Sequence, residues 1–210
     1  MFNERMSDTS DKSDAIPAGS ETVPLPDLRG RGLVLRPWRP DAEADLDAYL
    51  RGLSDPEFLR WNTPSILVKD LADARVSLRA RSENVSRGTE AAFCVTDEET
   101  GAILGHVGIN NINDTMSVAL VGYWTLPEAR GRGVARRALA LATDWAFRYR
   151  GLHRLELGHA LGHDVSCRIG EAVGFRYEGT LRDAMFAEGR HDAFRDVHLH
   201  GRLTTDEAPV

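Results

Sequence analysis

The stretch that decides the fold is 117–148, with the sequence SVALVGYWTLPEARGRGVARRALALATDWAFR. Its first part, 118–124, is a nearly continuous apolar run of residue types that favour strands, and it stops at Pro127. Beyond the turn, apolar residues recur at helical spacing, at Val134, Ala138, Leu141 and Trp145. The stretch therefore predicts a largely buried strand, a turn rich in Gly and Arg, and an amphipathic helix.

The turn at 130–133 lies where the first helical residues follow, so its glycines stand at a helix N-terminus. The first turn of a helix carries unpaired backbone N–H groups and the positive end of the helix dipole. Gly131 and Gly133 lack the Cβ atoms that would keep an anion from the backbone, and four arginines surround them. We interpret the turn as a pyrophosphate cradle. A tight strand-to-helix turn with a solvated basic rim is the alternative.

The segment 130–135, RGRGVA, resembles the R/Q-x-x-G-x-G/A signature of the GNAT superfamily of acyl-CoA-dependent N-acyltransferases. Arg130, Gly133 and Ala135 occupy its defined positions. Further matches to the RimJ/RimL-like branch follow in order, at 122–128, 163–166, 174–175 and 178–182. At 163–166 the branch has N-x-x-S, and His163 replaces the Asn. The resemblance covers roughly 33 to 203. Each motif alone is a weak indication of the family, but the whole set in this order is specific for it.

The resemblance implies an α/β fold with a mixed, mostly antiparallel central sheet, splayed strands and flanking helices. It also implies acetyl-CoA as the donor, with its pantetheine arm between the splayed strands. The coenzyme-binding residues that it implies are Trp124, Thr125, Leu126, Arg130, Gly131, Arg132, Gly133, Val134, Ala135, Arg136, His163 and Ser166. A backbone N–H near Thr125 or Leu126 is expected to polarise the thioester carbonyl.

Periodicity and capping residues predict the other elements. We expect a strand from Leu33, a helix capped by Asp41, a short helix at 55–59, a helix at 70–86 with Leu71, Ala74 and Leu78 facing inward, a hairpin at 91–96 and 102–109, a strand at 153–157, a helix at 164–173 stopped by Gly174, and strands at 176–185 and 193–203. The expected order is β-α-α-α-β-β-β-α-β-α-β-β, which suits the fold that the resemblance implies.

The catalytic residues are harder to choose. The resemblance places Ser166 where its hydroxyl would hydrogen-bond to the coenzyme A sulfur or protonate it, although a Ser there is also a good helix cap. His163 is either a hydrogen-bond donor, a proton carrier or a surface residue. His106 and His159 are candidate bases, with Glu156 a third, because Leu120 and Met185 stand where relatives offer carboxylates. A mechanism through solvent, with no dedicated base, remains open.

Composition bounds the class of protein. A chain of 210 residues, 42% of them hydrophobic, suits one domain with a core, expected at 29–205 after a disordered leader at 1–28. Cys94 and Cys167 give neither a disulfide framework nor metal-ligand spacing, so we expect no metal and a cytoplasmic location. A net charge of −6 argues against nucleic acid, and no apolar run is long enough for a membrane span.

These observations predict an N-acetyltransferase that acts on a primary amine, either a protein N-terminus or a small molecule. Transfer of a longer acyl group, such as succinyl, is an alternative, because the cradle would bind the shared pyrophosphate. A noncatalytic coenzyme A-binding regulatory module is another. A nucleotide-binding domain is disfavoured, since neither G-x-x-x-x-G-K-[ST] nor G-x-G-x-x-G occurs. A homodimer is a further expectation from the resembling branch.

Overall fold

The computed structural model describes residues 25–64 and 66–207. Its elements are β1 (Leu28–Gly30), β2 (Leu33–Pro37), α1 (Glu43–Ser54), α2 (Pro56–Trp61), α3 (Leu71–Ser86), β3 (Ala91–Asp97), β4 (Ile103–Asn113), β5 (Val118–Thr125), the 3-10 turn η1 (Pro127–Ala129), α4 (Val134–Arg148), β6 (Arg154–Ala160), α5 (Asp164–Ala172), β7 (Arg176–Phe186) and β8 (Phe194–Leu203). The first strand thus precedes the expected start at Leu33. Most of the leader expected at 1–28, residues 1–24, lies outside the described residues.

The strands form one sheet in the order β1-β2-β3-β4-β5-β6-β8-β7. Every neighbouring pair is antiparallel except β5 and β6, which are parallel and joined by α4. This confirms the predicted mixed, mostly antiparallel sheet.

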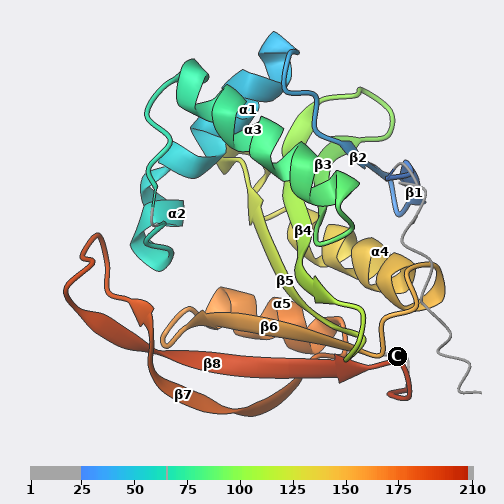
Figure 1. Cartoon of the computed structure of the whole chain (residues 1–210), viewed down its shortest axis with the longest axis vertical. Helices are drawn as coiled ribbons and strands as arrows, with labels where there is room; N and C mark the ends of the chain where they lie inside the picture. The colour runs from blue at the N-terminus through green and yellow to red at the C-terminus, as the bar shows by residue number, and fades with distance from the viewer. Residues whose placement is uncertain (1–24, 65, 208–210) are drawn as a thin grey trace, which may run out of the picture.

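The strands β5 and β6 pair only at their beginnings, where Val118–Leu120 lie opposite Arg154–Glu156. Beyond this point β5 continues to Thr125 and β6 to Ala160 without pairing to each other. Figure 1 shows the two strands diverging, so that β5 stands upright while β6 runs with β8 across the base of the view. The predicted splayed strands are confirmed, and we call the space between them the slot.

Helices cover both faces of the β2–β5 part of the sheet (Figure 1). On one face α4 packs through Ala138, Leu139 and Ala142 onto a core that includes Phe93. On the other face α1 and α3 pack onto a second core, which contains Tyr49. The smaller α5 packs against β6 and β7. Burial of two apolar layers fixes the central sheet, from which the outer strands project.

Aspartate side chains cap two helices, but not the helix for which a cap was expected. Asp55 caps α2 by accepting a hydrogen bond from the Phe58 amide at 2.9 Å, and Asp70 caps α3 in the same way. Asp41 does not cap α1, which begins one residue later than a cap at that position would give, after Ala42. Its carboxylate instead accepts a hydrogen bond from Arg79 at 2.9 Å, so a tertiary ion pair replaces the expected cap.

Two expectations of burial are wrong. Leu71 is 40% exposed because it lies in the first turn of α3, while Ala74 and Leu78 are fully buried as expected. The strand β5 is only partly buried: its residues alternate in exposure, and Leu120 is 40% exposed. The departure of β6 leaves the edge of β5 opposite β4 unpaired beyond Leu120.

Candidate active site

The turn between β5 and α4 is open and left-handed at both glycines. Gly131 has φ +72° and Gly133, which precedes the first helical residue, has φ +68°. A Cβ atom placed on either glycine would meet no atom of the described residues within 4 Å. These positions therefore need glycine for their backbone conformation, and the space in front of them is free for a ligand.

The backbone amides of this turn have no acceptor in the described part of the chain. The first hydrogen bond of α4 runs from the Arg137 amide to the Gly133 carbonyl, at 3.1 Å. The N–H groups of residues 131–136 donate to no described residue, so six consecutive amides are free at the positive end of a helix. This arrangement suits a diphosphate.

Two of the four arginines around the turn are engaged by other groups of the protein. The guanidinium of Arg130 is paired with the carboxylate of Asp55, the residue that caps α2. Arg137 donates to the Arg31 carbonyl at 2.5 Å. Arg132 and Arg136 are exposed and remain the side chains that can add charge to the free amides. Arg130 thus connects the turn to α2.

The edge of β5 that faces the slot exposes different backbone groups from those expected. The amide of Leu126 donates to the Leu104 carbonyl at 2.9 Å, so it is not available to a ligand. The antiparallel register, which places Gly105 opposite Thr125, assigns the backbone groups of Trp124 to the β4 side as well. The same alternation turns the N–H and C=O groups of Tyr123 and Thr125 toward the slot. The backbone groups of Trp124 and Leu126 therefore face β4 and not the slot, contrary to expectation, whereas those of Thr125 face the slot, together with those of Tyr123.

The side chain of Trp124 belongs to the core. Its ring lies 5.9 Å from that of Trp38, and a Cβ atom on Gly52 would come within 2.2 Å of it. Only 9% of Trp124 is exposed. The ring therefore supports β5 from the α1 side and does not line the slot.

Ser166 lies across the slot from β5, in the first turn of α5. The helix begins at Asp164 after His163, so Ser166 is its third residue and does not cap it. Its side chain is buried, and its carbonyl accepts a hydrogen bond from the Tyr123 hydroxyl at 3.5 Å. Burial raises the pKa of Tyr123 to about 12, so this phenol stays neutral. The contact joins the two diverging strands through α5.

His163 is held between secondary elements. Its ring stacks on Trp61 at the end of α2, with centroids 4.5 Å apart and planes 6° from parallel. Burial, followed by the charge of nearby His159, lowers the pKa of His163 to about 4. His163 is therefore a partly buried, neutral imidazole, which excludes the alternative of a free surface residue.

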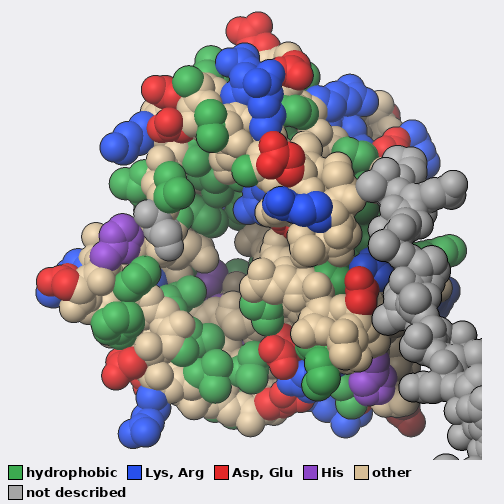
Figure 2. Space-filling model, viewed as in Figure 1, with side chains coloured by type: hydrophobic (Ala, Val, Ile, Leu, Met, Phe, Trp, Pro, Cys, Tyr) green, Lys and Arg blue, Asp and Glu red, His purple; other side chains and the backbone are tan. Residues whose placement is uncertain are grey.

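The outer side of the slot is closed by α2 and the β7–β8 hairpin. Arg195 donates to the Arg60 carbonyl at 3.0 Å, and Thr63 Oγ1 donates to the Ala187 carbonyl at 2.9 Å. In the space-filling view the molecule is hollowed between α2 and the strands β6 and β8 (Figure 2). A ligand in the slot would thus have walls on both sides.

Two of the candidate bases have structural partners. His106 is 5% exposed and its Nδ1 accepts a hydrogen bond from Trp38 Nε1 at 3.0 Å. Burial holds the pKa of His106 well below its usual range. Glu156 accepts from Arg154 Nε at 2.8 Å. Neither group is presented to the slot as a free base.

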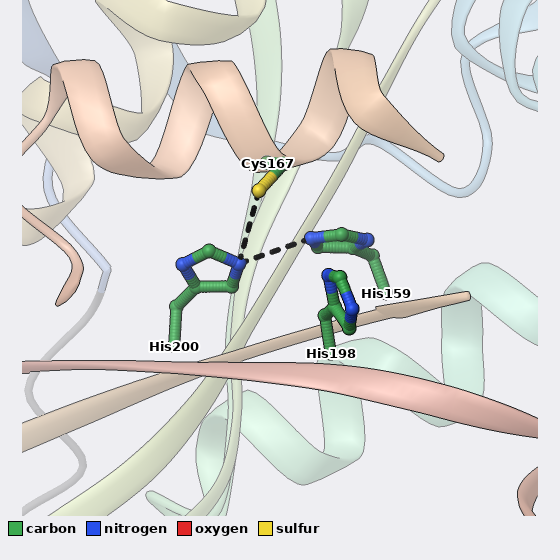
Figure 3. A group of neighbouring side chains, drawn as sticks. All are labelled: His159, Cys167, His198 and His200. Carbon is green, nitrogen blue, oxygen red and sulfur yellow. Dashed lines mark hydrogen bonds between the residues drawn. The ribbon is translucent and has the colours of Figure 1, made fainter. Parts of the chain in front are cut away.

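His159, the remaining candidate base, lies in a cluster that the sequence analysis missed. Its Nε2 is 3.1 Å from Nε2 of His200, and His198 and Cys167 complete the group (Figure 3). Burial lowers the pKa values of His159 and His200. The His-x-His spacing at 198–200 was the available signal, because alternate residues of a strand share a face.

Comparison with known proteins agrees with this architecture. Residues 32–176 match the family model described as the acetyltransferase (GNAT) domain. Since that match spans most of the chain, the protein belongs to the GNAT family of acetyltransferases. Among the described residues, no helix is long and apolar enough to cross a membrane.

Individual relatives fall within the same family. YdaF of Bacillus subtilis, provisionally named a ribosomal N-acetyltransferase, is 30% identical over 91 residues, which cover 43% of this chain and half the length of YdaF. Spermidine N(1)-acetyltransferase of Vibrio cholerae is 26% identical over 56% of this chain and 68% of its own. The structure of Mycobacterium smegmatis RimJ in complex with CoA-disulfide superposes with a TM-score of 0.75, at 25% identity, over 87% of this chain and 89% of RimJ.

Proposed function

We propose that the chain transfers the acetyl group of acetyl-CoA to a primary amine by direct attack on the thioester. The observation that carries the proposal is the run of six amides at 131–136 that donate to no described residue, at an exposed glycine turn next to the slot between β5 and β6. The diphosphate would accept hydrogen bonds from these amides, with Arg132 and Arg136 beside it. The similarity to RimJ, whose structure contains CoA-disulfide, supports coenzyme A as the carrier of the acyl group.

The proposed reaction uses two groups of the protein around the thioester. The amine nitrogen attacks the carbonyl carbon, the C–S bond breaks, the nitrogen loses a proton and the departing thiolate gains one. The Thr125 amide, on the free edge of β5, is the proposed donor to the developing oxyanion. Ser166, across the slot, is the proposed proton donor to the sulfur.

A dedicated base is not part of the proposal. His106 and Glu156 are engaged elsewhere, and His163 is fixed by stacking on Trp61. Removal of the amine proton through water is consistent with these contacts. His163 would then serve as a wall that orients the pantetheine.

The acceptor is proposed only as a class, a primary amine on a protein N-terminus or on a small molecule such as a polyamine. YdaF and spermidine N(1)-acetyltransferase represent these two possibilities among the relatives. Transfer of a longer acyl group is the second candidate, because the free amides would contact the diphosphate and not the acyl chain.

A panel of acyl-CoA donors and amines tests the proposal. We expect release of free thiol with acetyl-CoA and at least one amine, and a product whose mass has grown by one acetyl group. Binding of coenzyme A without turnover of any donor–amine pair would instead support a noncatalytic module. Faster turnover of succinyl-CoA than of acetyl-CoA would support the longer acyl donor.

A further inference from the structure

We propose that His159, His198, His200 and Cys167 form a tetrahedral zinc site that joins β6, β8 and α5. The four side chains converge from three elements, as Figure 3 shows. All four potential ligand atoms lie within 4.8 Å of one another. The site is distinct from the free amides at the start of α4 and goes beyond the acetyl transfer proposed above.

The sheet register brings the histidines together. His159 of β6 lies directly opposite His198 of β8, and Leu157 lies opposite His200. Residues that pair across strands, and alternate residues within a strand, point to the same face. All three imidazoles therefore share the face on which α5 packs, and Cys167 projects from α5 toward them. Strand register thus gathers the three histidines, and the packing of α5 adds Cys167.

The distances suit zinc ligands. Tetrahedral zinc, with bonds of about 2.0–2.1 Å to nitrogen and about 2.3 Å to sulfur, places two nitrogens about 3.3 Å apart and a nitrogen and a sulfur about 3.6 Å apart. Nε2 of His159 and Nε2 of His200 are 3.1 Å apart. Sγ of Cys167 is 3.6 Å from the same His200 nitrogen. His198 and Cys167 are only partly buried, so small rotations of their side chains could close the coordination.

The surroundings of His159 also match a ligand. Its Nδ1 lies 3.1 Å from the Ala160 carbonyl, which favours a proton on Nδ1 and leaves Nε2 as the acceptor. Histidines that bind metals usually donate their second ring N–H to a carbonyl or carboxylate in this way. His159 and His200 are buried, whereas the other two ligands reach the surface and give an ion a path of entry.

Zinc bound here would have a structural role. Four protein ligands leave no open position for substrate, which is typical of structural zinc sites. The ion would cross-link the wall of the slot formed by β6 and β8 to the helix that carries Ser166, the neighbour of Cys167. His159 would then be a ligand and not the base that removes the amine proton.

Metal analysis of the untagged full-length protein tests the site directly. After dialysis against metal-free buffer we expect about one zinc per chain by mass spectrometry. Adding zinc to chelator-treated protein, at about one hundred times the dissociation constant, should raise Tm by about 5–10 °C. Absence of retained zinc together with an unchanged Tm would overturn the proposal.

Cobalt(II) in place of zinc identifies the ligands. The wild type should show a thiolate-to-cobalt charge-transfer band, which Cys167→Ser removes and Cys94→Ala, a change in the opposite core, retains. His198→Gln should weaken metal binding at least about ten-fold, whereas His153→Gln, on an exposed residue, should not. Equal binding by the His198→Gln and His153→Gln variants would show an adventitious ion only.

Two comparisons separate folding and catalysis from metal binding. The metal-free Tm of Cys167→Ser should match that of the metal-free wild type, so that its loss of the cobalt band reports the ligand. Gly133→Glu, which alters the proposed coenzyme site, should keep its zinc. Loss of zinc from Gly133→Glu with an intact fold would contradict the independence of the two sites.

Discussion

Replacing Gly133 with Glu tests the assignment of the free amides. The substitution puts a carboxylate where the diphosphate is proposed to lie, in a space that holds no described atom within 4 Å of the new Cβ. At an effective dielectric constant of about 20, two unit charges about 8 Å apart repel by about 2 kcal/mol. A repulsion of this size corresponds to a KM for acetyl-CoA about 30-fold higher.

A matched control removes the effect of backbone strain. Gly151 lies beyond the other end of α4, has φ +73° and, like Gly133, has no described atom within 4 Å of the position that a Cβ would take. A residue with a side chain that replaces either glycine must adopt the same left-handed backbone, which costs about 1–2 kcal/mol. Gly133→Glu and Gly151→Glu should therefore lower Tm by similar amounts, while only Gly133→Glu weakens the binding of acetyl-CoA.

The assay is steady-state release of free thiol at varied acetyl-CoA, with a fixed amine, together with calorimetric binding of coenzyme A. Raising the salt concentration should reduce the difference between the two variants, because it is electrostatic. The reasoning is refuted if Gly133→Glu folds and binds coenzyme A like the wild type. Equal loss of affinity in both variants would refute it as well.

The remaining predictions concern the slot and its supports. Ser166→Ala should lower kcat about a hundred-fold or more, with little change in coenzyme A affinity. Ser82→Ala, which removes a hydroxyl bonded within α3, should leave kcat unchanged. An unaffected kcat in Ser166→Ala would exclude the proton-donor role. The pKa of Tyr123 is about 12 in the folded chain and about 10 in the unfolded chain, so the unfolded state loses the phenol proton at a lower pH than the folded state does. The free energy of unfolding should therefore fall by about 2 kcal/mol as pH rises from 10 to 12. Urea titrations should show a smaller loss over that range in Tyr123→Phe, and equal losses would count against the burial of this phenol. Gly52→Ala should cost about 1–3 kcal/mol in urea denaturation, because its Cβ would lie 2.2 Å from the Trp124 ring, and a neutral result would mean that this core repacks freely.

Local sequence signals predicted most elements near their observed positions. The turn signals and the glycine stop after α5 act within a few residues, so they can be identified along the chain. The prediction that Asp41 caps α1 was wrong because it depended on a contact with a distant residue. The Asp41 carboxylate can either cap the helix that follows it or pair with Arg79 of α3. Which of the two it does depends on how α1 and α3 pack together.

The candidate histidines show the same limit more clearly. His106 and His159 both occupy strands near the slot, and a linear pattern cannot distinguish their faces or neighbours. Packing buries His106 against Trp38, while strand pairing places His159 beside His198 and His200. The cysteine beside Ser166 gave no metal-ligand spacing because its partners lie on other elements.

The sequence by itself determined the sites that depend on neighbouring residues, above all the glycine turn before α4 and its free amides. Left-handed backbone and an unpaired helix start are local properties, so they can be derived from a short segment. Only the tertiary structure decided which edge of β5 is open, which arginines stay free and which side chains meet beneath α5. These features depend on strand register and on contacts between distant segments, which form only when the chain is packed.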